Sequence, residues 1–348
     1  MRRLLPAVAA IALMVLFGFG IYSVLGTLKS NKHNSQKPTQ TEALIDLPGT
    51  VYVVQNGDLY SLSNLKFTQL KAPAYDWVQV APAPDGDILA VAYSSMYSNV
   101  YLLNAQGQVV RQMLSESSSQ YFNNHWAYYP RVSPNGSTLF YASDWYQPGN
   151  QYNVDFQIQA VPFANPSDRA VIWSEANLDY QGGDVEPIPL ANGGLIYTKY
   201  DINTDSGSPT EGATYGQLAY VSYPGAIPTF LTTAAEDCSE PALSPAGTEI
   251  AMICSSSISL QTTTLDVASW NGTTLGPLVE ISSGPLPSSP TWSPDGKSVL
   301  YLNTLLTDKS SPFQLWWVPK ATAKKPGAAQ QVTEDLNFTA TSPPIWTS

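Results

Sequence analysis

The residue types that could do chemistry gather in four long segments of this 348-residue chain: 115–126, 143–153, 174–184 and 200–215. The first combines aromatic side chains with glutamate and histidine, and the second and third combine them with aspartate. Aromatic rings interleaved with polar groups can stack on a sugar or hold a loop of a partner protein. The alternative is that each ring packs inside the fold and shields the ends of strands. The candidate binding residues are Tyr121, Phe122, His125, Trp126, Asp144, Trp145, Tyr146, Tyr152, Asp179 and Asp184.

The fourth segment has the composition of a calcium loop. Its oxygen-bearing residues alternate before a glycine and a glutamate: Asp201, Asn203, Asp205, Gly207 and Glu211. Oxygen donors at alternate positions can converge on one Ca²⁺ ion while a glycine permits the tight bend. An EF-hand loop has glycine at the sixth position and glutamate at the twelfth, whereas here Ser206 is sixth and the glutamate is eleventh. A polar turn without metal is the other interpretation, and calcium is the one cofactor that the sequence raises.

The two cysteines of the chain, Cys238 and Cys254, lie at equal distances from a turn at 244–247. Two residues equidistant from a hairpin turn face each other across the strands, with Cα atoms near the ~5.5 Å that a disulfide needs. A location outside the cytoplasm would permit the bond. The sequence therefore predicts either a disulfide or two small buried thiols.

Sequence signatures of catalysis are missing. The chain has no Gly-x-Ser-x-Gly elbow, no His-Glu-x-x-His pair, no phosphate-binding glycine loop and no Cys-x-x-Cys pair. It contains two histidines, of which His33 lies in a polar segment and His125 in a long aromatic one. Two carboxylates could still support sugar hydrolysis. The sequence favours a binding protein over an enzyme.

The charge of the chain argues against a nucleic-acid partner. There are 27 acidic against 16 basic residues, for a net charge of −11, and all the acidic residues lie beyond residue 40. Such a surface repels phosphate. At 43% hydrophobic and 11% aromatic, the chain can bury a large core and is not of the disordered class.

The N-terminal segment predicts a membrane anchor. Residues 4–28 carry no charge and follow Arg2 and Arg3. At about 1.5 Å per residue this run reaches ~37 Å, enough to cross a ~30 Å hydrocarbon core. It is longer than the apolar core of about 7–15 residues in a cleaved signal peptide, which favours a retained anchor. We therefore expect a transmembrane signal-anchor helix over 1–28, a polar stalk over 29–46, and a folded body over 47–348 outside the cytoplasm, in an extracellular or periplasmic location.

A repeated turn organises the folded body. The sequence PTWSPDGKSVLY from Pro290 recurs as PRVSPNGSTLFY from Pro130 and PALSPAGTEIAM from Pro241. Weaker copies begin at Val80 and Pro187, so the starts are 49 to 57 residues apart. In Ser-Pro-Asp-Gly, proline presets φ, aspartate accepts local backbone N–H groups, and glycine takes a positive φ. Each copy therefore predicts a hairpin, and two further β runs after it give four antiparallel strands per repeat.

The two ends of the chain predict a sixth repeat that they share. Residues 344–348 resemble the first strand of a copy, and the chain ends there. The segments 47–53, 58–62 and 67–70 resemble the three remaining strands. A repeat built from both ends would close a ring and leave no open sheet edge.

The Pro-x-Trp-Ser-Pro-Asp-Gly frame resembles the WD40-like (PD40) repeat of TolB-type propellers, over about residues 47–348. The resemblance implies an all-β fold, a six-bladed β-propeller. TolB itself has an α/β domain before its propeller, where this sequence has the stalk. The Ser-Pro-Asp-Gly turns are tight, so the long segments fall on the opposite face, where binding residues usually lie. We expect a membrane-anchored, non-enzymatic module that binds a protein or another cell-envelope partner through this face. The alternative is a carbohydrate-binding or carbohydrate-active propeller.

Overall fold

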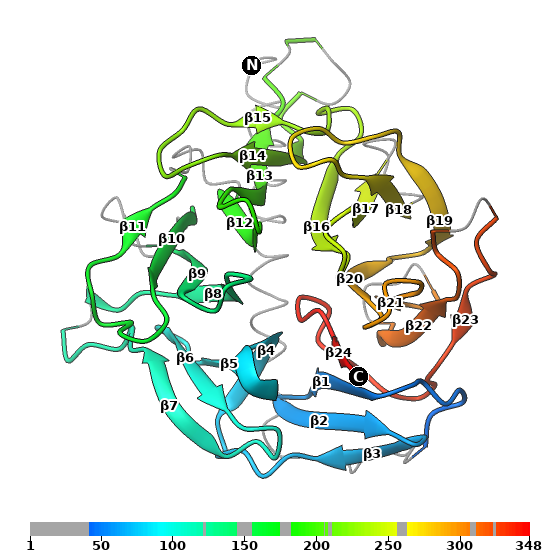
Figure 1. Ribbon diagram of the computed structural model, residues 1–348, viewed down its shortest axis with the longest axis horizontal. Helices are drawn as coiled ribbons and strands as arrows, with labels where there is room; N and C mark the ends of the chain where they lie inside the picture. Colours follow the sequence, from blue (N-terminus) through cyan, green and yellow to red (C-terminus); the bar gives the residue numbers. More distant parts are fainter. Residues whose placement is uncertain are drawn as a thin grey trace, which may run out of the picture. The chain divides into compact units, whose positions relative to one another are not determined.

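The computed structural model describes residues 42–120, 123–144, 155–174, 182–204, 206–207, 211–255, 263–306, 311–322 and 325–348. Over these ranges the chain forms six four-stranded antiparallel sheets arranged as a ring (Figure 1). The predicted all-β, six-bladed β-propeller is therefore confirmed. The predicted transmembrane helix over 1–28 lies outside the described residues. The search for helices long and apolar enough to cross a membrane, which covered the described residues, found none.

Each sheet is one blade, and its strands follow one another from the axis of the ring outwards. Blade 1 contains β4 (Asp76–Pro82), β5 (Ile88–Tyr93), β6 (Ser98–Leu103) and β7 (Val109–Leu114). Blade 2 contains β8 (Ala127–Val132), β9 (Thr138–Ser143), β10 (Gln157–Pro162) and β11 (Val171–Ile172). Blade 3 contains β12 (Asp184–Pro189), β13 (Leu195–Ile202), β14 (Thr214–Val221) and β15 (Thr229–Phe230).

The other three blades complete the ring. Blade 4 contains β16 (Cys238–Leu243), β17 (Glu249–Ser255), β18 (Thr263–Ser269) and β19 (Val279–Gly284). Blade 5 contains β20 (Ser288–Trp292), β21 (Val299–Asn303), β22 (Gln314–Val318) and β23 (Gln330–Gln331). Blade 6 contains β24 (Ile345–Thr347), β1 (Thr50–Gln55), β2 (Asp58–Ser63) and β3 (Lys66–Gln69). A short 3₁₀ turn, η1 (Pro84–Gly86), joins β4 to β5.

The repeated turns form as their residue types predict. In blade 5, Asp295 accepts hydrogen bonds from the Ser293 hydroxyl at 2.6 Å and from the Lys297 backbone N–H at 3.1 Å. Gly296 has φ +69°, a conformation that glycine adopts without steric cost. The backbone N–H of Ser293 then donates to Ser298 at 2.9 Å, which closes the hairpin. The local chemistry of the frame thus sets the register between the first two strands of the blade.

The two ends of the chain meet in blade 6, as predicted. The C-terminal strand β24 pairs antiparallel with β1, with Val51 opposite Trp346 (Figure 1). The indole N–H of Trp346 donates to the Pro48 carbonyl at 2.7 Å. A Cβ atom on Gly49 would lie 2.0 Å from the Thr347 carbonyl oxygen, so only glycine fits this close approach. The ring is therefore closed by one strand of the C-terminus.

Apolar side chains fill the spaces between neighbouring blades. Between blades 4 and 5, Ala251 and Leu265 pack against Trp292, Val299 and Tyr301. The tryptophan of the repeat frame also crosses this boundary, because the indole N–H of Trp292 donates to Ala242 of blade 4 at 2.8 Å. The frame residue therefore joins one blade to the previous one.

The predicted stalk and the start of the propeller overlap. Ala43 is buried in the core between blades 5 and 6, and the backbone N–H of Leu44 donates to Val332 at 2.8 Å. Glu42 forms an isolated bridge with Lys66. The described end of the predicted 29–46 stalk is thus packed on the propeller.

The innermost strand of each of the first five blades contains a bulge. Register shifts occur between Val185 and Ile188, and likewise in β4, β8, β16 and β20. In four of these strands the residue before the frame proline has φ between +53° and +58°: Tyr129, Glu186, Glu240 and Ser289. A bulge bends the strand and re-aims a side chain. These four residues line a cavity on the axis of the ring.

Candidate functional site

The long connections lie at one end of the sheets. The repeated tight turns join the first and second strands of a blade, and a meander alternates between its two ends. The second-to-third connections and the crossings from blade to blade therefore lie at the opposite end, which we call the long-loop face. His125, Trp126, Asp144 and Asp184 of the predicted binding set are described there. Outside the described residues lie Tyr121, Phe122, Trp145, Tyr146, Tyr152 and Asp179.

His125 and Asp144 come together where the chain enters blade 2. Nδ1 of His125 lies 3.5 Å from Oδ1 of Asp144, whose side chain is only 1% exposed. The same Asp144 oxygen accepts the backbone N–H of Trp126 at 2.6 Å, while the backbone N–H of His125 donates to the Glu116 carbonyl at 3.0 Å. The hydrogen bond to Asp144 is the main reason that the pKa of His125 is raised. Burial raises the pKa of Glu116. The imidazole is thus paired with Asp144, and its charge also acts on the Glu116 carboxyl.

Asp184 and Asp155 hold the crossing from blade 2 to blade 3. Nζ of Lys199 on β13 lies 3.1 Å from Oδ1 of Asp184 at the start of β12. Burial raises the pKa of Asp184 to about 6, and the charge of Lys199 opposes that shift. Asp155 accepts the backbone N–H of Gly182 at 3.1 Å. Both carboxylates therefore fix neighbouring segments of the long-loop face.

The described aromatic residues of blade 2 pack between strands. Tyr128 and Phe156 meet edge to face at 5.7 Å between ring centroids, and Phe140 meets Trp173 in the same way at 5.1 Å. Trp126 is half-buried beside them. Such contacts shape and stiffen the base of the long-loop face.

The predicted calcium loop joins β13 to β14. The Asn203 backbone N–H donates to Ala213 at 2.9 Å, and the Glu211 carboxylate accepts the backbone N–H of Gly207 at 2.9 Å. Asp205 lies outside the described residues. Among the residues that are described, no group of three or more His, Cys, Asp or Glu side chains could hold a metal ion. Calcium at this loop stays a prediction.

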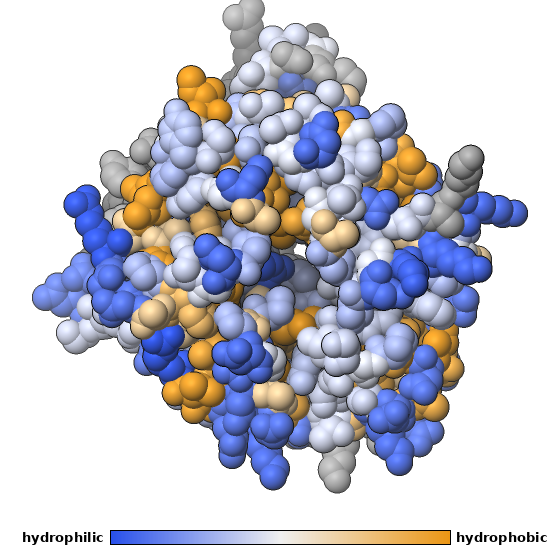
Figure 2. Space-filling view, in the orientation of Figure 1, coloured by the Kyte–Doolittle hydropathy of each residue, from blue (hydrophilic) through white to orange (hydrophobic). Residues whose placement is uncertain are grey.

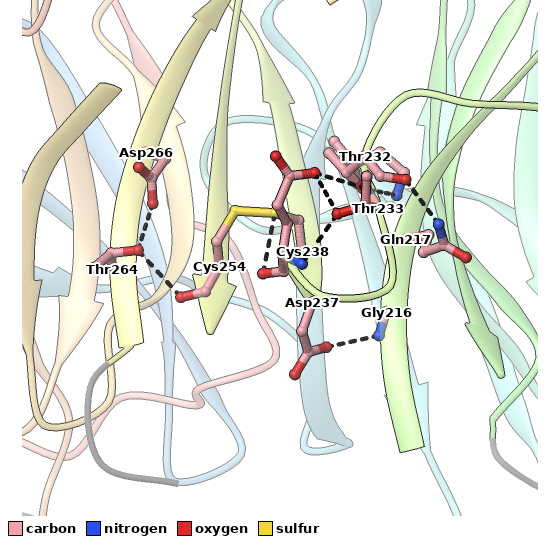
Figure 3. The surroundings of a disulfide bond; sticks show 11 residues. Gly216, Gln217, Thr232, Thr233, Asp237, Cys238, Cys254, Thr264 and Asp266 are labelled. Atoms are coloured by element: carbon pink, nitrogen blue, oxygen red, sulfur yellow. Dashed lines mark hydrogen bonds between the residues drawn. A yellow bond between two sulfur atoms is a disulfide. The ribbon is translucent and has the colours of Figure 1, made fainter. Parts of the chain in front are cut away.

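Cys238 and Cys254 form a disulfide near the long-loop end of blade 4 (Figure 3). They are directly opposite each other on β16 and β17, with Cα atoms 4.1 Å apart. The neighbouring Asp237 accepts the backbone N–H of Gly216 on blade 3 at 2.7 Å. Thr264 on β18 donates its hydroxyl to the Cys254 carbonyl at 3.2 Å. Of the two alternatives predicted from the sequence, the structure has the disulfide.

A second group of polar residues surrounds the axis of the ring. A cavity of about 120 Å³ is lined by charged and phenolic side chains: Tyr129, Arg131, Glu186, Tyr200 and Glu240. The space-filling view is hollowed at the same central position (Figure 2). Sequence reasoning missed this site. Its signal was the residue one position before the start of the frame, which is polar in all five copies: Gln79, Tyr129, Glu186, Glu240 and Ser289.

This axial cavity is lined by two acidic side chains, Glu186 and Glu240, and one basic side chain, Arg131. Burial and the charge of Glu186 raise the pKa of Glu240 to about 8. Burial also raises the pKa of Glu186, but hydrogen bonds from Thr198 and the Glu240 backbone, together with the Arg131 charge, oppose that shift. Burial lowers the pKa of Arg131 to about 10, so its guanidinium stays charged at neutral pH. The cavity can therefore hold and exchange a proton.

The class of the protein follows from this geometry: it is a six-bladed β-propeller closed by its own C-terminal strand. No family model matches the sequence, and no curated protein matches it. The fold is similar to TolB from Acinetobacter baumannii, with a TM-score of 0.60 and 16% identity over 86% of this chain and 67% of that one. The structure is therefore a TolB-like propeller.

Other solved structures share the fold in larger proteins. Kuenenia stuttgartiensis hydrazine synthase matches with a TM-score of 0.55 and 11% identity over 87% of this chain and 48% of that one. A puromycin-hydrolyzing peptidase of Mycobacterium tuberculosis matches with a TM-score of 0.50 and 13% identity, over 84% and 45%. This chain thus spans less than half of either protein, and the likeness is one of fold.

Proposed function

We propose that the protein is a non-enzymatic binding module, tethered to a membrane by residues 1–28, whose propeller lies outside the cytoplasm. Its long-loop face would bind a protein or another component of the cell envelope. The observation that carries this proposal is the asymmetry of the ring. The repeated tight turns occupy one end of the blades. The longest connections, which run from β7 to β8, β9 to β10 and β23 to β24, lie at the other end on a scaffold of sheets, which is how binding loops are usually presented.

The net negative charge of the chain favours a basic partner. The whole chain carries a net charge of −11. Complementary charge on a partner would speed its association and orient it. We therefore expect a partner surface rich in lysine and arginine.

The roles of the described carboxylates support binding over catalysis. Asp144 and Asp155 accept backbone N–H groups, and Asp184 is paired with Lys199. Groups engaged in this way hold the loops in place and so preorganise a binding surface, which lowers the entropic cost of association.

A cross-linking experiment tests the proposal. A photoreactive amino acid would replace Asn123 on the long-loop face of the full-length protein in its native membrane, and Gln106 on the tight-turn face would serve as the matched control. Both positions are exposed. We expect a defined protein adduct from position 123 and at least tenfold less from position 106. Equal adducts from both faces, or none from position 123, would contradict the proposal.

Adding a positive charge to the long-loop face and screening a glycan array separate the two candidate functions. Ser117→Arg on the long-loop face should weaken capture of a basic partner, whereas Gln106→Arg should not. The carbohydrate alternative predicts binding of the full-length protein to defined glycans on an array, with no dependence on this charge. That outcome would replace the protein-binding proposal.

A further inference from the structure

A belt of hydrogen bonds joins the innermost strands around the axis of the ring. On one side, the Gln79 amide accepts the backbone N–H of Tyr129 at 2.7 Å, which joins blade 1 to blade 2. The same amide donates to the Thr341 carbonyl at 3.2 Å, which joins blade 1 to the segment before β24. The belt therefore includes the segment that closes the ring.

Two glutamates carry the other side of the belt. Glu186 of blade 3 accepts the backbone N–H of Glu240 in blade 4 at 2.8 Å. Glu240 in turn accepts the backbone N–H of Ser289 in blade 5. The hydroxyls of Ser288 and Ser289 both donate to the Ala340 carbonyl at 2.6 Å, just before β24. The chain of contacts runs from blade 3 to the closing segment through two carboxyl groups.

The charges that face this pair come from three blades. Arg131 on β8 is the one cation among the residues that line the described cavity, and its charge acts on Glu186. Tyr129 on β8 and Tyr200 on β13 stay neutral, because burial raises the pKa of both phenols. With both glutamates ionised, the cavity would hold two negative charges against one positive charge. Like charges at such close quarters in a partly dry cavity favour retention of one proton.

The neighbouring charges place the proton on Glu240. Both glutamates accept hydrogen bonds that favour the ionised form, Glu186 from the Thr198 hydroxyl at 2.7 Å and the Glu240 backbone, and Glu240 from the Ser289 backbone. The Arg131 charge favours ionised Glu186. For Glu240, the neighbouring charge that acts is that of Glu186, and it disfavours ionisation.

We propose that Glu186 and Glu240 form a proton-controlled lock on the closure of the propeller. While the pair holds its proton, Glu240 stays in the cavity and orients Ser289 toward the closing segment. When the proton leaves, the repulsion between the two carboxylates outweighs the stronger hydrogen bond that an ionised acceptor makes with the Ser289 N–H, and that contact opens. The lock concerns how the ring stays closed and does not depend on which partner the long-loop face binds.

The sign of the pH dependence follows from the folded pKa of Glu240, which is about 8 against an ordinary value of 4.5. The folded state binds this proton more tightly than the unfolded state does. Its contribution to stability is therefore complete below pH 4.5 and is lost as the pH rises through about 8. A single proton can change the opening equilibrium by at most about tenfold per pH unit.

Hydrogen exchange on the full-length protein in detergent tests the lock. The Ser289 amide and the β24 amides would be followed from pH 6 to pH 9.5, with rates corrected for the intrinsic effect of pH. In the natural protein we expect protection at Ser289 to fall about tenfold or more above pH 8. In Glu240→Gln, which keeps an uncharged side chain, protection should not change with pH. Glu280→Gln, an exposed change on the same blade, should behave like the natural protein.

Glu186→Gln provides a second, independent test that does not need the Glu240 variant to fold. Removing the neighbouring charge should abolish the loss of protection above pH 8, because the charge that repels ionised Glu240 is then gone. Protection at Ser289 that is constant across this range in the natural protein would overturn the proposal. So would an equal loss in the natural protein and in either Glu240→Gln or Glu186→Gln.

Discussion

At the scale of single residues, the fold buries the Asp184 carboxylate and pairs it with the Lys199 ammonium. The Asp184 and Lys199 side chains are 1% and 10% exposed. Because burial raises the pKa of Asp184 to about 6, this group stabilises the fold fully below its ordinary value of 3.8, and this contribution is lost as the pH rises through about 6. The Lys199 charge limits that loss. The pair therefore fixes β12 against β13 as long as both members are present.

Removal of one member of this pair should be costly. We expect Lys199→Met to lower the free energy of unfolding by about 3–5 kcal/mol, because it leaves the Asp184 charge buried without compensation. The exposed pair of Lys297 and Asp295, with side chains 75% and 59% exposed, is the matched control. Lys297→Met should change stability by less than about 1 kcal/mol. Urea unfolding measures both values, and equal effects would show that the buried pair has no special role.

At the scale of elements, hairpins are the units that the sequence specifies most directly. The disulfide joins residues 16 positions apart across the hairpin of β16 and β17. A cross-link of this span limits the unfolded chain and stabilises a protein by about 3 kcal/mol in the chain-entropy account. Asp237, directly before Cys238, links blade 4 to Gly216 of blade 3.

The double change of Cys238 and Cys254 to serine should therefore lower the free energy of unfolding by about 3 kcal/mol. A reducing agent should lower the stability of the natural protein by a similar amount and leave the double variant unaffected. Guanidinium unfolding with and without reductant checks this expectation. A reductant effect of the same size in the variant would mean that the loss has another cause.

Some features of these strands and turns could be predicted from the sequence, and others could not. The Ser-Pro-Asp-Gly turns and the shared sixth blade follow from local turn chemistry and an even repeat. The register of the turn alone would place Cys238 opposite Ser255, and the bulge between Ser239 and Ala242 brings it opposite Cys254.

The axial glutamates do not follow from the turn chemistry or the repeat. The same position is occupied by Gln79, Tyr129 and Ser289 in the other copies. The bulge that turns these residues to the axis also breaks the alternation of side chains along a strand. Much of the long-loop face lies outside the described residues, so its predicted aromatic residues stay predictions.

At the scale of the whole molecule, the ring depends on one joint. Five blades are continuous in sequence, whereas blade 6 takes β24 from the C-terminus and three strands from the N-terminal side. The belt around the axis also converges on this joint, because Gln79, Ser288 and Ser289 all bind carbonyl groups at 340–341. Opening of the ring should therefore begin at this joint.

Trp346 tests where the ring opens, with Trp292 as its matched control. Both side chains are buried, and both indole N–H groups donate to a backbone carbonyl, Pro48 for Trp346 and Ala242 for Trp292. Each change to alanine should cost about 3–5 kcal/mol by urea unfolding. Because only Trp346 lies on the joint, carboxypeptidase under native conditions should remove C-terminal residues from Trp346→Ala much faster than from Trp292→Ala. Equal release from the two variants would mean that the ring has no weakest joint and unfolds as a whole.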